Sequence, residues 1–174
     1  MIELRGAKRL PAPAGEADAV VEGVRALLTV SLPALAISEL ADARVAAVAA
    51  RLLERRVAEA LRESGVKVTQ ASGVAMTGRT HVDLGSVIGS FLLSGDEAHV
   101  KGAAAAARVQ IAKLIDDGPT ASELERAVDD AAGEIGARIE SADYWSQSLA
   151  MAGFLRVPVD ELGTAPAMIK ATTA

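Results

Sequence analysis

The chain has 174 residues, of which 51% are hydrophobic and 24% charged, so it is long enough to bury one globular core. Its net charge is −5 with acids and bases interspersed, which gives no basic surface for nucleic acid and no polybasic patch for membranes. No cysteine occurs, which excludes disulfides, thiolate catalysis and metal sites held by cysteine.

Two further features bound the class of protein. Aromatic residues make up only 2% of the chain, so the core must be built from Ala, Val, Leu and Ile. The N-terminal segment lacks the apolar core of a secretion signal, and no apolar run approaches the ~20 residues of a membrane span. We therefore expect a soluble, cytoplasmic protein.

The first part of the chain predicts little regular structure. Residues 1–21 show neither a helical nor a strand period and carry two prolines and a glycine between positions 11 and 15, which predicts a linker or a loosely packed lead-in. Residues 22–174 are expected to form a single domain. Within it, residues 23–32 alternate between apolar and polar side chains, which predicts a half-buried strand that ends at Pro33.

Residues 38–65 predict the longest helix of the chain. Apolar residues recur there at steps of three and four, and most charged residues fall off that stripe. Ser38 is the expected N-cap, and Gly65 is the expected left-handed stop. The predicted buried stripe comprises Val45, Val48, Ala49, Leu52, Leu53, Val57, Ala60 and Leu61.

A hairpin and a second helix are expected next. Residues 66–76 and 81–93 are both strand-like and flank a short turn with a glycine, which predicts a long antiparallel hairpin. Ser94 and Glu97 then fit the S-x-x-E capping box, so we expect Ser94 to cap a helix that runs to Gly118.

Three more helices complete the predicted chain. Thr120 and Glu123 form a second capping box, which predicts the start of a third helix. Residues 143–155 hold the only Tyr and Trp, and they predict a short helix that docks its aromatic side chains. A last helix is expected after Thr164. The resulting order, strand, helix, strand, strand and then helices, predicts a two-layer α+β sandwich with a mainly antiparallel sheet covered on one face by helices.

Four segments, in their order, resemble the pitrilysin, insulinase and mitochondrial processing peptidase family of zinc peptidases. They are LTVSLPA, RVAEALRESG, DDGPTASELERA, and DYWSQSLAMAGF followed by APAMIKATTA. The likeness is to the second, C-terminal unit of the shorter family members and spans roughly residues 22–174. It implies a processing-peptidase-like metallohydrolase fold, which in the family continues into a further helix and strand beyond the last segment matched here.

The catalytic motif of that family is absent from this sequence. Catalytic units carry H-x-x-E-H on a helix, in which two histidines bind zinc and the glutamate activates a water. The only histidines here are His81 and His99, and a zinc site needs at least three convergent ligands. We therefore expect both histidines to be solvent-facing or structural and this chain to hold no metal or catalytic residue. The resemblance implies that zinc is bound by a partner unit.

The resemblance also implies a substrate-binding role for arginines near the end of the long helix. Arg62 fits the arginine of the family's L-R-E segment, and Arg56 fits an earlier one, so both are candidate substrate-binding residues. Where the family often reads G-L-A-Y, residues 65–68 read Gly-Val-Lys-Val, so the tyrosine hydroxyl is lost. A solvated helix face is the alternative interpretation of both arginines.

Two functional hypotheses follow. In the first, the chain is the non-catalytic half of a pitrilysin- or insulinase-like zinc peptidase and lines a peptide-binding chamber with an H-x-x-E-H unit, which lies on the same polypeptide or on a separate subunit. In the second, the chain is an inactive scaffold or interaction subunit that keeps the fold for assembly or self-association, which the lost tyrosine favours. An unrelated α+β binding module is a third interpretation. No nucleic-acid or membrane partner is expected.

Overall fold

The computed structural model describes residues 20–21, 25–34, 40–77, 85–155 and 158–171. Its strands are β1 (Val20–Val21), β2 (Arg25–Ala34), β3 (Lys67–Thr77) and β4 (Gly85–Ser94). Its helices are α1 (Leu40–Glu63), α2 (Glu97–Asp116), α3 (Ala121–Ile139), α4 (Ala142–Leu155), α5 (Asp160–Gly163) and α6 (Ala165–Ala171).

The strands form one antiparallel sheet in the order β1-β2-β4-β3. β4 pairs with β2 along the whole length of both strands. β3 pairs with the other side of β4, with an irregularity between Val68 and Gln70. β3 is therefore an outer strand, and its far edge pairs with no strand among the described residues.

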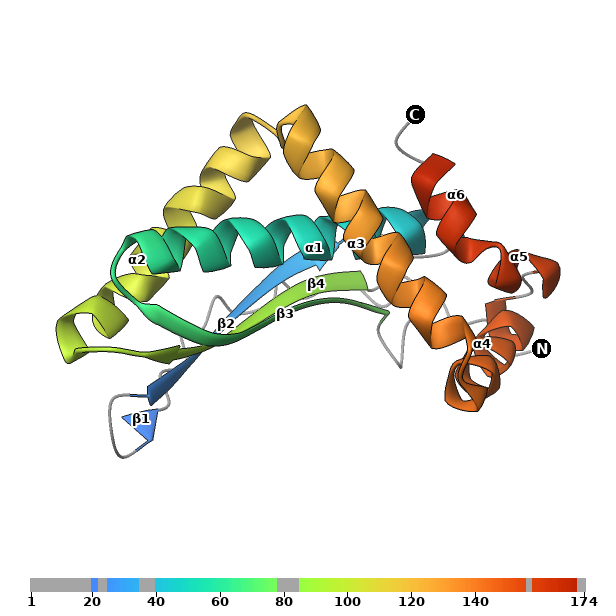
Figure 1. Ribbon diagram of the computed structural model, residues 1–174, viewed down its shortest axis with the longest axis horizontal. Coiled ribbons are helices and arrows are strands. Elements are labelled where there is room, and N and C mark those ends of the chain that lie inside the picture. Colours follow the sequence, from blue (N-terminus) through green and yellow to red (C-terminus); the bar gives the residue numbers. More distant parts are fainter. Residues whose placement is uncertain (1–19, 22–24, 35–39, 78–84, 156–157, 172–174) are drawn as a thin grey trace, which may run out of the picture.

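Helices cover one face of this sheet, which confirms the expected α+β sandwich. α1 runs along the sheet and packs against β3 and β4, while α2 packs beside α1 and reaches β2 (Figure 1). α3 packs on α1, and the short α6 packs on both α3 and α1. The helices α3 and α6 thus add a second set of contacts to α1, which the sequence pattern did not predict.

Two apolar clusters hold these elements together, and α1 contributes to both. The larger cluster lies between the sheet and helices α1 and α2, and it buries Leu53, Leu61 and Phe91 completely or almost so. The smaller cluster joins Val48 of α1 to α3 and to Ile169 of α6. One residue of the predicted buried stripe is wrong: Val45 belongs to neither cluster and is 52% exposed.

Two glycines that face each other across β3 and β4 allow α1 to approach the sheet closely. Gly73 lies opposite Gly89 in the ladder. A Cβ at Gly73 would lie 2.1 Å from the carbonyl oxygen of Ala50 in α1, and a Cβ at Gly89 would lie 2.9 Å from the ring of Phe91. The missing side chains leave space for the helix backbone over one strand and for an aromatic ring over the other.

The C-terminus of α1 is closed as predicted. Gly65 has a φ of +86°, its amide donates to the Arg62 carbonyl, and the Val66 amide donates to the Leu61 carbonyl. These bonds form a Schellman motif, which requires the left-handed conformation that glycine adopts without strain. The expected N-cap, Ser38, lies outside the described residues.

Two boundaries differ from the predictions. β2 runs through Pro33 instead of ending there. Beyond Ala26, β2 pairs on one side only among the described residues, and a strand edge tolerates the missing amide of proline. The N-cap of α2 is Asp96 rather than Ser94, because Ser94 is still paired in β4. The Asp96 carboxylate accepts the His99 amide at 3.0 Å.

Some predictions fall partly outside the described residues. Of the expected lead-in, residues 1–19 are not described, whereas Val20 and Val21 pair with β2 as the short strand β1. The hairpin is confirmed as β3 and β4, but its turn and His81 lie in the undescribed segment 78–84. None of the described helices is long and apolar enough to cross a membrane.

The aromatic pair of α4 fastens the C-terminal helices to one another, as the sequence predicts. The Tyr144 hydroxyl donates to the Leu162 carbonyl of α5 at 3.1 Å, and the Trp145 indole donates to the Ile139 carbonyl of α3 at 2.7 Å. The two rings pack edge to face at 5.6 Å between centroids. Both side chains are half-buried, so each combines apolar packing with a satisfied polar group.

Candidate functional site

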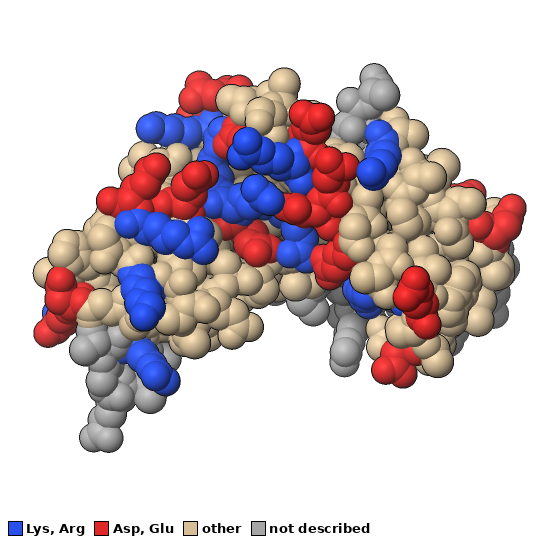
Figure 2. Space-filling model, in the orientation of Figure 1, with Lys and Arg blue, Asp and Glu red and all other residues tan. Residues whose placement is uncertain are grey.

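Charged side chains concentrate on the outer face of α1, where α3 crosses it. Figure 2 shows arginine and lysine side chains gathered in the middle of this face with aspartate and glutamate on both sides of them. The basic residues of α1 come from a run of arginines at positions 51, 55, 56 and 62. Because the apolar positions of α1 are used against the sheet and α3, these arginines are left at the margins of both contacts.

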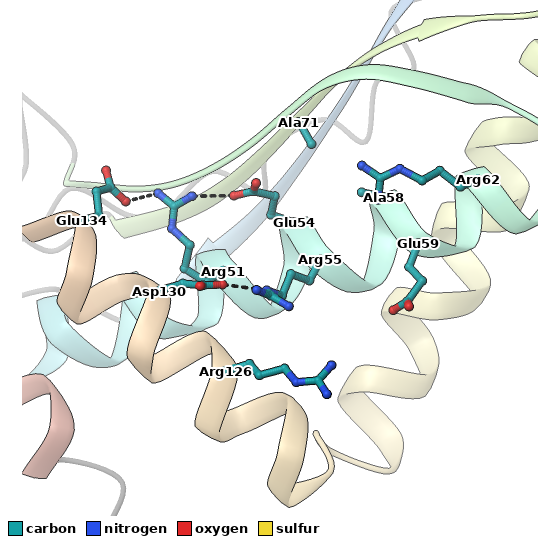
Figure 3. A pocket seen from close by; sticks show the side chains of 10 residues that line it. All are labelled: Arg51, Glu54, Arg55, Ala58, Glu59, Arg62, Ala71, Arg126, Asp130 and Glu134. Carbon is teal, nitrogen blue, oxygen red and sulfur yellow. Dashed lines mark hydrogen bonds and ion pairs between the residues drawn. The ribbon is translucent and has the colours of Figure 1, made fainter.

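A hollow of about 660 Å³ opens between α1, α3 and the outer strand β3, and we call it the α1–α3 hollow. Its walls are almost entirely charged (Figure 3). The lining residues are Arg51, Glu54, Arg55, Ala58, Glu59, Arg62, Ala71, Arg126, Asp130 and Glu134.

Two arginines of α1 form ion pairs that fix one end of the hollow. Arg51 donates to Glu54 at 2.5 Å within α1 and also pairs with Glu134 of α3. Arg55 donates through Nε to Asp130 of α3 at 2.6 Å. Their guanidinium groups are therefore engaged in joining the two helices, and each bond between ionised partners adds to the α1–α3 packing.

Arg56, the first predicted substrate-binding residue, forms an ion pair with the start of α3. Its Nε and one terminal nitrogen donate to the two carboxylate oxygens of Glu123 at 2.8 and 2.7 Å. Glu123 is also the third helical residue of α3, and it completes the predicted capping box with Thr120. The Arg56 bonds and the Thr120 amide together hold the pKa of the Glu123 carboxyl at about 2, and the same pair raises the pKa of Arg56. The Arg56 guanidinium therefore links α1 to the first turn of α3 through Glu123.

Arg62, the other predicted substrate-binding residue, lies in the hollow. It is exposed, belongs to the last turn of α1, and extends along the helix toward Ala58 (Figure 3). Within the described part of the chain it forms no ion pair or side-chain hydrogen bond. The structure therefore distinguishes the two candidates: Arg56 pairs with Glu123, whereas Arg62 has no such partner among the described residues.

A second available arginine, Arg126 of α3, was missed by sequence reasoning. It lines the same hollow from the opposite wall and, among the described residues, has no ion-pair partner. No local pattern marks it, because its place depends on how α3 crosses α1. The only sequence signal was its charge within the E-L-E-R segment.

The free edge of β3 borders the hollow. The Gly73 amide donates to a carboxylate oxygen of Glu54 at 2.9 Å, which places this amide on the edge that faces away from β4. Ala71 lies two residues before Gly73 and lines the hollow. Residues two apart in an antiparallel strand direct their amide and carbonyl to the same side, so those of Ala71 also point to the free edge. An outer strand with outward-facing amides is a template for a further extended chain.

The family's tyrosine position is apolar here. Val66 is 2% exposed, and Val68 packs against the main cluster at the start of β3. Neither side chain can donate a hydrogen bond toward the hollow.

His99 contacts residues at the start of α2 and at the end of α1. Its Nδ1 contacts Asp96, and its ring lies against Gly65, so that it joins the start of α2 to the end of α1. No group of three potential metal-binding side chains is found in the part of the chain that the structure describes.

Compared with known proteins, the chain matches no family model and no curated protein sequence.

Proposed function

We propose that this chain is the non-catalytic half of a pitrilysin- or insulinase-like zinc peptidase. In this proposal it forms one wall of a peptide-binding chamber, and a partner unit with H-x-x-E-H holds the zinc and performs the cleavage. The partner is a separate subunit or another part of the same polypeptide. The four sequence segments support the family assignment, and the α+β sandwich is consistent with it.

The observation that carries the proposal is the free edge of β3 beside Arg62. Extended peptides bind by adding a strand to a sheet edge, where the main chain supplies affinity and neighbouring side chains supply specificity. Here Ala71, whose amide and carbonyl lie on the outer edge of β3, lines the α1–α3 hollow, and Arg62 extends into the same hollow. A peptide on β3 would therefore lie beside a guanidinium that the described residues do not occupy.

The alternative function is an inactive scaffold or interaction subunit, and the face of the sheet that no described helix covers favours it. Leu27 of β2 and Val74 of β3 are 51% and 48% exposed, and in the registers with β4 they lie on the same face as Leu92 and Ile88. These four side chains suit contact with another protein surface or with a second copy of the chain.

Affinity capture of the native protein, followed by mass spectrometry of intact polypeptides, distinguishes these functions. We expect a stoichiometric component that contains H-x-x-E-H and a peptidase activity that a zinc chelator abolishes. Recovery of the chain alone, or of partners that lack the motif, would contradict the peptidase proposal.

A second test uses the captured complex. The Arg62→Ala variant is expected to lower peptide cleavage at least tenfold, about 1.4 kcal/mol in transition-state binding, without loss of assembly. Lys101→Ala is the matched control, because Lys101 pairs with Glu97 at the start of α2, outside the hollow. If assembly requires the domain and the Arg62→Ala complex cleaves peptides normally, the scaffold function is supported instead.

The cytoplasmic location is also a proposal, which cell fractionation would test.

A further inference from the structure

Some of the charged side chains that line the α1–α3 hollow form ion pairs with one another, and others have no partner among the described residues. Three of its carboxylates, on Glu54, Asp130 and Glu134, are engaged by Arg51 or Arg55. Arg62 and Arg126 have no such partner among the described residues, although both line the hollow. Two guanidinium groups of the hollow are therefore unpaired among the described residues and accessible to an external anion.

These two arginines lie on different walls of the hollow, and Arg62 is the one on the β3 side of α1 (Figure 3). Arg62 comes from α1, and Arg126 comes from α3. Side chains of an extended peptide alternate between its two faces, so every second side chain of a peptide on β3 would face the helices. Carboxylates at these positions are matched by guanidinium groups, which bind them through paired hydrogen bonds.

We propose that the α1–α3 hollow selects extended peptides with acidic side chains, through Arg62 and Arg126. This inference rests on the proposed function in that the peptide is the substrate held in the chamber, but binding itself requires only this chain. Glu59 also lines the hollow and, among the described residues, has no ion-pair partner, so its negative charge opposes the acidic peptide. Removal of this charge strengthens binding, whereas removal of either arginine weakens it.

Fluorescence anisotropy with the full chain tests the proposal directly. The probes are labelled ten-residue peptides of one backbone sequence that carry Glu, Gln or Lys at every second position. We expect the Glu peptide to bind at least tenfold more tightly than the Gln peptide and the Lys peptide more weakly still. The preference should fall with added salt, because exposed charges are screened.

Variants assign the preference to residues. Arg62→Ala and Arg126→Ala are each expected to lower affinity for the Glu peptide several-fold and to leave the Gln peptide unchanged. Glu59→Gln should raise affinity for the Glu peptide, and Lys101→Ala, which removes a positive charge outside the hollow, should change nothing. A Glu peptide with alternate backbone nitrogens methylated should lose binding, since pairing with β3 requires those amides.

The outcomes separate this inference from the proposed function. Equal binding of the Glu and Gln peptides, or equal effects of Lys101→Ala and Arg126→Ala, would overturn the acidic selectivity. A captured H-x-x-E-H partner would leave the peptidase function in place in that case. Selective binding by the full chain without any such partner would support the acidic site and contradict the peptidase function.

Discussion

Glu54 accepts a hydrogen bond from the backbone amide of Gly73 at 2.9 Å, across the boundary between helix α1 and the free edge of strand β3. The same carboxylate oxygen accepts from Arg51 at 2.5 Å. A helix side chain thus satisfies one of the outward-facing amides of an outer strand. This contact prevents the Gly73 amide from pairing with a further strand. Ala71, two residues earlier on the same edge, has no such contact among the described residues and lines the hollow.

Replacement of Glu54 should destabilise the protein more than replacement of an ordinary surface acid. Glu54→Ala removes the acceptor of the Gly73 amide and one of the two partners of Arg51. We expect a loss of about 1–2 kcal/mol in the free energy of unfolding, measured by urea titration. Glu97→Ala is the control, since Glu97 is 81% exposed and pairs only at the surface. An equal loss in both variants would contradict a structural role for Glu54.

Gly73 should tolerate no side chain. A Cβ at this position would meet the Ala50 carbonyl oxygen at 2.1 Å, and a helix backbone cannot move away as a flexible side chain does. We expect Gly73→Ala to cost about 1–3 kcal/mol, because α1 must shift from the sheet. Gly102→Ala should instead stabilise by roughly 0.5–1 kcal/mol, since Gly102 lies within α2 and a Cβ there meets nothing within 4 Å. Thermal unfolding of both variants gives the comparison, and a neutral Gly73→Ala would refute the close approach.

The Arg56–Glu123 pair predicts a specific acid dependence. The pKa of Glu123 is held at about 2, below its ordinary value of 4.5, so the folded state favours the ionised carboxyl. The resulting stability is fully present above about pH 4.5 and is lost as the pH falls from 4.5 toward 2. In the wild type, the free energy of unfolding should decrease across this interval, and Glu123→Gln should decrease less steeply there.

Glu125→Gln serves as the matched control for that measurement. Glu125 lies two residues further along α3, is exposed, and pairs with no other described residue. It should keep the acid dependence of the wild type. At neutral pH, Glu123→Gln should be about 1 kcal/mol less stable than this control, because a capping interaction and a charged hydrogen bond are weakened. Identical pH profiles of the two variants would rule out the assigned role of Glu123.

The buried Arg44 predicts an asymmetric response to mutation. Its side chain is 8% exposed and pairs with Glu161 of α5 at 3.2 Å, while its Nε has no hydrogen-bond partner within the described structure. Glu161→Gln leaves a buried charge without its counter-ion and should cost about 1–2 kcal/mol, a value reduced because Glu161 is 40% exposed. Arg44→Met removes the charge itself and should be neutral or stabilising. The opposite order in chemical denaturation would show that the buried guanidinium stabilises the fold by more than its desolvation costs.

The features of the fold that depend on short-range chemistry could be predicted from the sequence. The left-handed stop at Gly65 and the capping box of Thr120 with Glu123 are both present, because each depends on a few neighbouring residues. For α2 the sequence pattern indicates Ser94 as the N-cap, whereas the cap is Asp96, because the pattern does not show that β4 stays paired up to Ser94. The edge of an element depends on its neighbour in space as much as on its own residues.

The candidate site was only partly predictable, for a related reason. Arg62 follows from the family-like segment at the end of α1, but Arg126 enters the hollow only because α3 crosses that helix. Arg56 lies on the same helix as Arg62, yet it forms an ion pair with Glu123, which is 67 positions away in sequence. Arg44 is buried, and its guanidinium pairs with Glu161 of α5, 117 positions away in sequence. Sequence spacing places these charges on a helix, and tertiary contacts decide which remain available.

α1 is the one described element that belongs to both apolar clusters, and this determines how the molecule comes apart. Separation of α1 from the sheet exposes Leu53 and Leu61, and the same movement removes Val48 from the cluster with α3 and α6. Loss of α1 from the sheet therefore disturbs both clusters, although they lie on different sides of the helix. Unfolding should proceed in a single cooperative transition, and the amides of α1 should be the last to exchange with deuterated solvent.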